Sequence, residues 1–260
     1  MEIIGLIPAG GVASRLGRIP CSKEIFPIQF INTNDSISVV SENLIHCFKK
    51  ADISTIYFII RRGKWDIPNY FGDGSQNEVN IGYLMVNLPH GTPFTLDQAQ
   101  PFVKDKIVAL GFPDIFFEPG DAYAKIIDKL RNTNSDLVLG IFPIENYLKW
   151  DMVEFDENSK VKNIVIKQDR PDLKFGWTIV VWKPSFTEFL HSFLKEFILQ
   201  NPDGMFKTKN NAIRELYVGD IIQAAISKGM HADYVKFKDG SSLDIGTPDD
   251  LYNYMRNTLK

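Results

Sequence analysis

The residues best suited to chemistry gather near the amino terminus, just after a short apolar run. Residues 3–7 are apolar and typical of a buried strand, and they lead into Ala9, Gly10, Gly11, Ser14, Arg15 and, eight residues later, Lys23. Glycine has no Cβ, so the backbone N–H groups of such a turn can approach an anion closely. An arginine forks onto phosphate oxygens, and a lysine adds a compact charge. This spacing predicts a triphosphate-binding loop at the end of a strand.

Other interpretations of this segment stay open at the level of sequence. A glycine turn in an ordinary α/β protein, with incidental basic residues, would look the same. The two commoner phosphate-binding patterns do not apply, because the sequence has no G-x-x-x-x-G-K-[ST] and the turn is not G-x-G-x-x-G.

The elements that must position this loop alternate along the first half of the chain. Strand-like apolar runs and helix-like patterns follow one another, with strands expected at 3–7, 55–60, 81–86, 107–110 and 136–142 and helices at 40–48 and 121–131. Repeated β-α-β units of this length imply a mostly parallel sheet with helices on both faces. The expected fold class is therefore α/β.

The second half is less regular. A hairpin is expected over 152–166, a strand over 176–182 and helices over 184–199 and 218–228. Ser185 and Glu188 predict a capping box for the first of these helices. The last helix is expected to begin with Thr247 as N-cap and Pro248 at its first position.

Composition narrows the class of protein. The 260 residues are 44% hydrophobic, carry a net charge of −3 and include two cysteines. This balance argues against a nucleic-acid or acidic-membrane surface, a disulfide framework and a cysteine metal site. With neither a signal-peptide pattern nor an apolar run of membrane-spanning length, we expect a cytoplasmic protein without nucleic-acid or membrane partners.

The amino-terminal segment resembles the signature of the sugar-phosphate nucleotidyltransferases, which include the glucose-1-phosphate thymidylyl- and uridylyltransferases. That signature is Gly-Gly-x-x-[Ser/Thr]-Arg-[Leu/Met] with a downstream lysine, and Gly10, Gly11, Ser14, Arg15, Leu16 and Lys23 fit it. The resemblance implies a three-layer α/β/α sandwich with a mixed, mostly parallel, Rossmann-like sheet. It also implies one domain over 1–260, with a nucleotide-binding half (1–118) and an acceptor-binding half (119–260).

Two aspartates resemble the metal-binding positions of the family. Asp114 follows the strand 107–110, although Phe112 and Pro113 stand between Gly111 and this aspartate. Asp244 is the second residue of a Leu-Asp-x-Gly-Thr-Pro stretch, which closes the catalytic region in the family. The resemblance implies that both bind Mg²⁺, which takes one or two carboxylates together with phosphates and water. Without it, Asp114 is a turn residue and Asp244 merely precedes a capped helix.

Two further positions follow from the resemblance. Lys167, in Ile166-Lys167-Gln168 where the family has Glu-Lys-Pro, matches a lysine that contacts the sugar phosphate. Gly91 and Thr92 lie in a loop that should meet the base and ribose. The alternatives are a solvated strand-end lysine and a plain loop-to-helix junction.

The activity implied is transfer of a nucleotidyl group from an NTP, with dTTP or UTP favoured, to a sugar 1-phosphate. Arg15 would hold the β- and γ-phosphates, Lys23 the α-phosphoryl charge and Lys167 the sugar phosphate, with Ala9, Gly10, Gly11 and Ser14 in the nucleotide loop. Cytidylyl or guanylyl transfer to a non-sugar phosphate or phosphonate, and a non-catalytic NTP-binding regulator, stay open. Family members are often dimers or tetramers, so a homo-oligomer is compatible with the resemblance.

Overall fold

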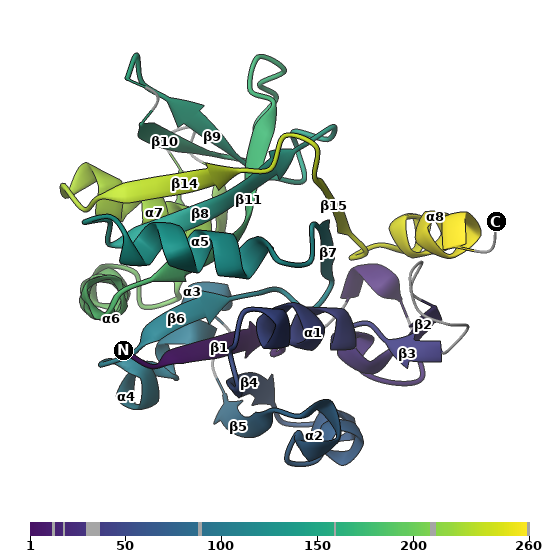
Figure 1. Ribbon diagram of the computed structural model, residues 1–260. Coiled ribbons are helices and arrows are strands. Elements are labelled where there is room, and N and C mark those ends of the chain that lie inside the picture. Colours follow the sequence, from purple (N-terminus) through teal and green to yellow (C-terminus); the bar gives the residue numbers. More distant parts are fainter. Residues whose placement is uncertain are drawn as a thin grey trace.

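The computed structural model describes residues 1–11, 14–17, 19–29, 37–87, 90–158, 160–208 and 212–258, and its centre is a nine-stranded sheet (Figure 1). Seven strands follow the order β10 (Val161–Ile166), β9 (Asp151–Phe155), β11 (Phe175–Trp182), β6 (Ile107–Leu110), β1 (Ile3–Pro8), β4 (Thr55–Arg61) and β5 (Asn80–Val86). The remaining two branch from β11, where β8 (Leu137–Pro143) pairs with β11 and β14 (Ala232–Lys236) pairs with β8.

The sheet is mixed, and most of its strands run in one direction. Strand β1 is parallel to β4 and β6, and β4 is parallel to β5. Strand β11 is antiparallel to β6, β8 and β9, and β10 is antiparallel to β9. Only β10 and β11 therefore oppose the other seven strands. The expected mixed, mostly parallel sheet is confirmed.

Helices cover both faces of this sheet, each over its own apolar cluster. One face packs against α1 (Glu42–Lys50), α2 (Asp66–Phe71) and α5 (Ala122–Arg131). The other packs against α3 (Thr92–Asp97), α4 (Gln100–Val103), α6 (Pro184–Gln200) and α7 (Val218–Ser227). Alternating strand residues point to opposite faces, so both clusters draw on the same strands. The three-layer α/β/α sandwich is thus confirmed.

Short elements complete the fold around the carboxyl-terminal helix α8 (Pro248–Thr258). The hairpin of β2 (Pro27–Gln29) and β3 (Ile37–Val39) contributes to a small apolar cluster with α8. Strands β12 (Met205–Lys207) and β13 (Ile213–Glu215) pair with each other, as do β7 (Ile115–Glu118) and β15 (Ser241–Asp244). The nine strands of the main sheet come from both halves of the chain, and the boundary near residue 118 stays a prediction.

The two predicted helix starts have different outcomes. The hydroxyl of Thr247 accepts the Asp250 N–H at 3.3 Å, which confirms Thr247 as the cap of α8. The capping box at Ser185 is wrong. The N-cap of α6 is Lys183, with no side-chain cap, and the Ser185 hydroxyl instead donates to Asp136 Oδ1 at 2.6 Å. No helix among the described residues is long and apolar enough to cross a membrane.

Candidate functional site

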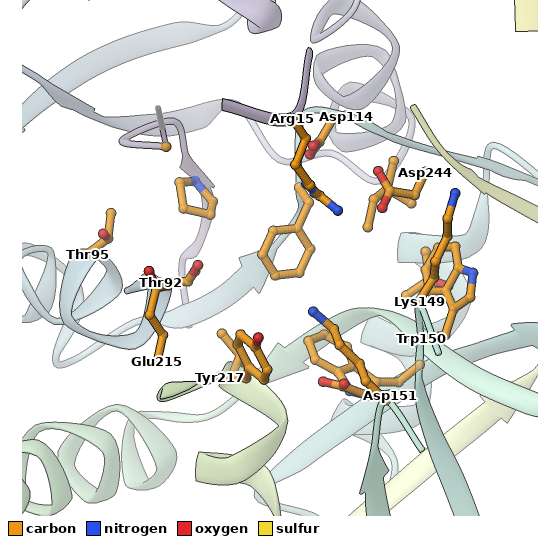
Figure 2. Close-up of a pocket in the computed structure, with 18 of the residues that line it drawn as sticks. Arg15, Thr92, Thr95, Asp114, Lys149, Trp150, Asp151, Glu215, Tyr217 and Asp244 are labelled. Carbon is orange, nitrogen blue, oxygen red and sulfur yellow. The ribbon is translucent and has the colours of Figure 1, made fainter. Parts of the chain in front are cut away.

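A cavity of about 280 Å³ opens where β1 and β6 end, and it collects most of the predicted site residues (Figure 2). The predicted residues that line it are Gly10, Gly11, Arg15, Lys23, Thr92, Asp114, Lys167 and Asp244. Arg15, Asp114 and Asp244 lie in the upper part of Figure 2, whereas Asp151 and Tyr217 lie in the lower part. We call the first group, with Gly10, Gly11 and Lys23, the glycine-loop wall. The facing group of Lys149, Asp151, Lys167, Trp177, Thr178 and Tyr217 is the Tyr217 wall.

The two aspartates of the glycine-loop wall meet because β7 and β15 pair. These strands lie side by side in Figure 1, and their register places Asp244 opposite Ile115. One residue beyond the ladder, the Ile245 N–H donates to the Asp114 carbonyl at 3.0 Å. Burial, and then the nearby charge of Asp114, raise the pKa of Asp244 above its usual range. This long-range ladder therefore brings together two carboxylates that are 130 positions apart in the chain (244 − 114).

Lys23 lies beside this pair of carboxylates and forms an ion pair with Asp114. Burial alone would lower the pKa of Lys23, but the attraction and hydrogen bond of Asp114, together with the charges of Glu24 and Asp244, outweigh it and the pKa is raised. Lys23 is therefore a cation at neutral pH, held against a predicted metal ligand.

The segment that carries Lys23 is tied down on both sides. The backbone N–H and hydroxyl of Ser22 donate to the two oxygens of Asp66, at 2.6 and 2.8 Å. The Glu24 carboxylate is fully buried and accepts from Lys64 Nζ at 2.7 and 2.8 Å. These contacts fix the backbone around Lys23 to helix α2 and to the chain just before it.

Arg15 reaches the same wall by passing over the backbone of Gly246. A Cβ at Gly246 would lie only 2.8 Å from Arg15 Nη2, so the glycine makes room for the guanidinium. The Gly246 N–H donates to Asp244 Oδ1 at 2.7 Å. Gly246 thus fixes the Asp244 carboxylate through its N–H and leaves space for the Arg15 side chain.

On the Tyr217 wall, Lys167 follows directly after β10 with a left-handed backbone φ of +43°, which is uncommon outside glycine. Its Nζ lies 4.1 Å from the centre of the Tyr217 ring, and the Arg214 guanidinium lies 4.4 Å from the same ring. Arg214 also donates to both oxygens of Asp220 at 2.7 and 2.8 Å. Tyr217 is thus fixed by two cations of the protein itself.

Two predicted nucleotide-binding residues, Ala9 and Gly91, do not line the cavity, and the side chain of a third lies outside the described residues. Ala9 is fully buried, and its N–H donates to the Ile59 carbonyl at 2.9 Å, so it continues the β1–β4 pairing instead. Gly91 has a φ of +88° and precedes Thr92; a Cβ there would lie 3.1 Å from the Leu216 carbonyl. It positions the loop by letting the backbone pass closely. Ser14 begins the turn Ser14–Leu16, but its side chain lies outside the described residues.

Sequence reasoning missed the start of β9. Lys149, Trp150 and Asp151 all line the cavity, and Lys149 Nζ is anchored by both oxygens of Asp250 at 2.6 and 2.7 Å. The only local signal was a carboxylate next to a tryptophan at the beginning of a predicted hairpin. Cavity position depends on how β9 docks beside β11, which the residues around 150 do not encode by themselves.

The Asp151 side chain is half-buried, and its Oδ1 atom is buried without a hydrogen-bond partner among the described residues. Burial raises its pKa to about 6, with Lys167 and Arg214 opposing the rise and Asp220 adding to it. Trp177 Nε1 lies close enough to favour the charged form but does not reach ordinary hydrogen-bond geometry. Asp151 is therefore a strained carboxylate that faces the cavity.

Known proteins with related sequences and folds identify the family. A family model described as nucleotidyl transferase matches residues 4–260. This chain belongs to that family. The match confirms the resemblance that the sequence motifs indicated from the glycine loop to the stretch around Asp244.

Among curated proteins, the chain is 22% identical over 251 residues to the low-salt glycan biosynthesis nucleotidyltransferase Agl11 of Haloferax volcanii. The alignment covers 95% of this chain and 63% of that protein, so the chain spans less than two thirds of the relative's length.

Solved structures share the fold at lower sequence identity. A putative glucose-1-phosphate thymidylyltransferase from Bacillus anthracis superposes with a TM-score of 0.80 at 19% identity, covering 99% of this chain and 95% of that one. A UDP-glucose pyrophosphorylase complexed with UDP-glucose superposes with a TM-score of 0.75 at 14% sequence identity, and the alignment covers 100% of this chain and 99% of that one. The inositol-1-phosphate CTP transferase from T. maritima superposes with a TM-score of 0.70 at 15% sequence identity, and the alignment covers 99% of this chain and 96% of that one. These likenesses support the Rossmann-like nucleotidyltransferase fold.

Proposed function

We propose that this protein transfers a nucleotidyl group from an NTP to a phosphorylated small molecule, with a sugar 1-phosphate as the favoured acceptor and dTTP or UTP as the favoured donor. The observation that carries the proposal is the single cavity that joins the glycine loop, Arg15, Lys23 and two carboxylates to Lys167 on the facing wall. Family membership and the curated nucleotidyltransferase relative support the same reaction class.

In this reaction an oxygen of the acceptor phosphate attacks the α-phosphorus of the NTP. A new P–O bond forms, the bond from the α-phosphorus to the bridging oxygen breaks, and pyrophosphate leaves with the electron pair. No protein nucleophile is needed, and neither Cys21 nor Cys47 lines the cavity. The protein therefore contributes positioning and charge stabilisation.

The charged side chains divide this work by their place in the cavity. Arg15 approaches over Gly246 and holds the β- and γ-phosphates, and the glycine loop leaves its backbone open to the same groups. Lys23 stabilises the charge that develops on the α-phosphoryl group, which requires it to leave Asp114 for a phosphate oxygen. Lys167 holds the phosphate of the acceptor from the facing wall, so the two reacting groups are brought together from opposite sides.

The residues present fit a Mg²⁺ ion at Asp114 and Asp244. Carboxylate oxygens are the ligands that Mg²⁺ prefers, and the β7–β15 ladder brings these two aspartates to the same wall of the cavity. No cluster of three or more acidic, histidine or cysteine side chains suited to a metal occurs within the described part of the chain, so substrate phosphates would complete the coordination. When bound, the ion would neutralise phosphate charge and orient the triphosphate.

A second candidate is cytidylyl transfer to a non-sugar phosphate. One of the structural neighbours is an inositol-1-phosphate CTP transferase, and its acceptor is a cyclic polyol rather than a sugar. The cavity and charge arrangement serve this reaction equally well, because the chemistry at phosphorus is the same.

The test is pyrophosphate release in the presence of Mg²⁺. Five NTPs (dTTP, UTP, CTP, GTP and ATP) are paired with hexose 1-phosphates, inositol 1-phosphate, phosphocholine and 2-aminoethylphosphonate. We expect release that requires one NTP, one acceptor and the metal together. NTP binding by calorimetry without release from any pair would favour a non-catalytic regulator, and no NTP binding would overturn the phosphate-loop assignment.

A further inference from the structure

Three strands of the main sheet, β5, β10 and β14, pair on one side only among the described residues. Such an edge presents backbone N–H and C=O groups to any extended chain that reaches it. Proteins commonly block an edge with charged side chains, an irregular register or a covering helix. The treatment of each edge therefore indicates whether it is meant to stay unpaired.

The edges at β10 and β14 are both blocked. Strand β10 carries Lys162 beside a register irregularity. Its Ile164 N–H donates to Gln223 Oε1 of α7 at 2.6 Å, so a helix covers part of this edge. Strand β14 includes Asp233 and Lys236 among its five residues. Charges, an irregular register and a helix thus hinder pairing at these two edges.

Strand β5, which lies at the lower margin of the sheet in Figure 1, has none of these devices. Residues 80–87 read Asn-Ile-Gly-Tyr-Leu-Met-Val-Asn, with no charged residue and no proline. All seven residues of the strand keep a regular register with β4. Met85 is 45% exposed, and Phe102 of α4, 53% exposed, packs against the Tyr57 ring that lies over Gly82. A regular, uncharged and partly apolar edge is the kind that pairs with another chain.

The hydrogen bonds of β5 show which part of its edge is open. The Asn80 N–H donates toward β4, to the Ser54 carbonyl at 2.7 Å. Successive residues of a strand direct their backbone groups to opposite sides, so residues 81, 83 and 85 direct theirs away from β4. The Ile81 N–H is already used, because it donates to the Asp73 carbonyl at 2.8 Å. The open part of the edge is therefore 83–87.

The charges at the two ends of this edge favour an antiparallel partner. Asp52 and Asp73 are exposed near the starts of β4 and β5. Arg61 and Arg62 are exposed at the other end, where Arg61 lies opposite Val86. An antiparallel second copy brings the acidic end of one edge beside the basic end of the other, whereas a parallel copy brings like charges together. A two-fold axis achieves this with one self-complementary surface.

We propose that two copies of this protein pair through β5, antiparallel about a two-fold axis, and so join their sheets into one. The axis falls at Met85, the centre of the open part 83–87. The outward N–H and C=O groups of Tyr83 and Met85 then form a ladder between the copies. No residue of β5 lines the cavity, so the pairing does not depend on the proposed function.

Sedimentation velocity over about 1–100 µM measures the assembly of the parent protein, and we expect a dimer. Met85→Lys places two like charges opposite each other at the axis, so the Kd of the dimer should rise at least about tenfold. The control is Leu199→Lys, which makes the same kind of change at an 80% exposed residue of α6 and should match the parent. Thermal melts followed by circular dichroism should show that both variants fold.

A cysteine cross-link tests the position of the axis. Opposite residues of a hydrogen-bonded antiparallel pair have Cα atoms about 5.5 Å apart, which a disulfide spans. Met85→Cys should therefore form a disulfide between two copies when diamide, which is reduced in the reaction, oxidises the two thiols. Leu199→Cys and the parent, with its own Cys21 and Cys47, should not cross-link.

Three results would overturn the proposal. A monomeric parent over the whole concentration range would leave the edge without a second copy. A dimer that Met85→Lys leaves unchanged would place the interface on another surface. Failure of Met85→Cys to cross-link in a dimeric protein would remove the axis from β5. Pyrophosphate release tests the proposed function separately, because none of these measurements needs turnover.

Discussion

The two walls of the cavity differ in whether their buried polar groups have partners within the protein. On the glycine-loop wall Lys23 is paired with Asp114, and just behind it Lys64 is paired with Glu24. On the Tyr217 wall the two lysines are also engaged, Lys149 with Asp250 and Lys167 over Tyr217, but three buried polar atoms find no partner in the part of the chain that the structure describes. The lysines of both walls are thus engaged within the protein, whereas three polar atoms of the Tyr217 wall, the carboxylate oxygen Asp151 Oδ1 with Trp177 Nε1 and Thr178 Oγ1, have no partner among the described residues.

This difference follows from the ligands proposed for each wall. A triphosphate brings several negative charges, which can displace Asp114 from Lys23 and replace one strong interaction with another. The sugar hydroxyls of the proposed acceptor bring no charge and compete poorly with water, so the groups that bind them must be buried and free beforehand. The following predictions test this contrast, beginning with the largest expected effect.

Replacing Glu24 tests how firmly the glycine-loop wall is supported. Glu24→Ala leaves the Lys64 ammonium buried without its partner, and breaking a buried pair costs about 3–5 kcal/mol. Denaturant unfolding should show a loss of this size. The control is Glu78→Ala, which removes the partner of Lys49 at an exposed site and should leave the unfolding free energy nearly unchanged. Equal losses would mean that the buried pair gives no special support.

Replacing Asp151 tests whether the Tyr217 wall is strained in the free protein. Its pKa of about 6, against 3.8 in an unfolded chain, means that the folded state loses stability as pH rises through this window. Asp151→Asn removes that cost of about 2–3 kcal/mol, so at pH 7.5 the variant should melt several degrees above the parent. Near pH 4 the two melting temperatures should converge. A variant less stable than the parent at pH 7.5 would contradict this.

Replacing Lys23 tests whether the glycine-loop wall stabilises the charge that develops during the reaction. Lys23→Ala should lower turnover by more than about tenfold, a loss of over ~1.4 kcal/mol in transition-state stabilisation. The acceptor KM should change little, because the lysine lies on the wall opposite to Lys167, which holds the acceptor phosphate. Lys125→Ala, which breaks an exposed pair with Asp121, serves as the control. Near-parent turnover in the Lys23 variant would remove the lysine from its proposed role.

Asp244 tests the metal assignment and has the smallest expected effect. Asp244→Asn keeps the side-chain oxygen that accepts the Gly246 N–H but removes the negative charge. The Mg²⁺ concentration for half-maximal activity should rise about threefold, the effect of losing part of one carboxylate's attraction. If the Mg²⁺ titrations of variant and parent overlay, the metal role of Asp244 is wrong.

Local patterns in the sequence were enough to predict the α/β class, the glycine loop and eight of the nine strands of the main sheet, all except β14. Some features depend only on residues close to them in the sequence, so they can be predicted without the tertiary structure. Examples are the apolar run 3–7, the paired glycines and the Thr247 cap. The Ser185 capping box failed because α6 begins one residue earlier, at Pro184, and the Ser185 hydroxyl donates to the distant Asp136 instead of accepting a backbone N–H. Ala9 is absent from the cavity wall for a similar reason, since its N–H is taken by β4.

The sequence alone determined which residue types stand at the ends of strands, and with the family resemblance it pointed to a phosphate loop, a metal pair and a strand-end lysine. Only the tertiary structure decided which of these meet. The β7–β15 ladder joins Asp114 to Asp244, and Lys23 pairs across to the first of them. The docking of β9 creates the Tyr217 wall together with a β-bulge in β11, where the pairing with β8 shifts between Trp177 and Ile179. Strand register and a one-residue bulge depend on packing over the whole sheet, so no short stretch of sequence specifies them.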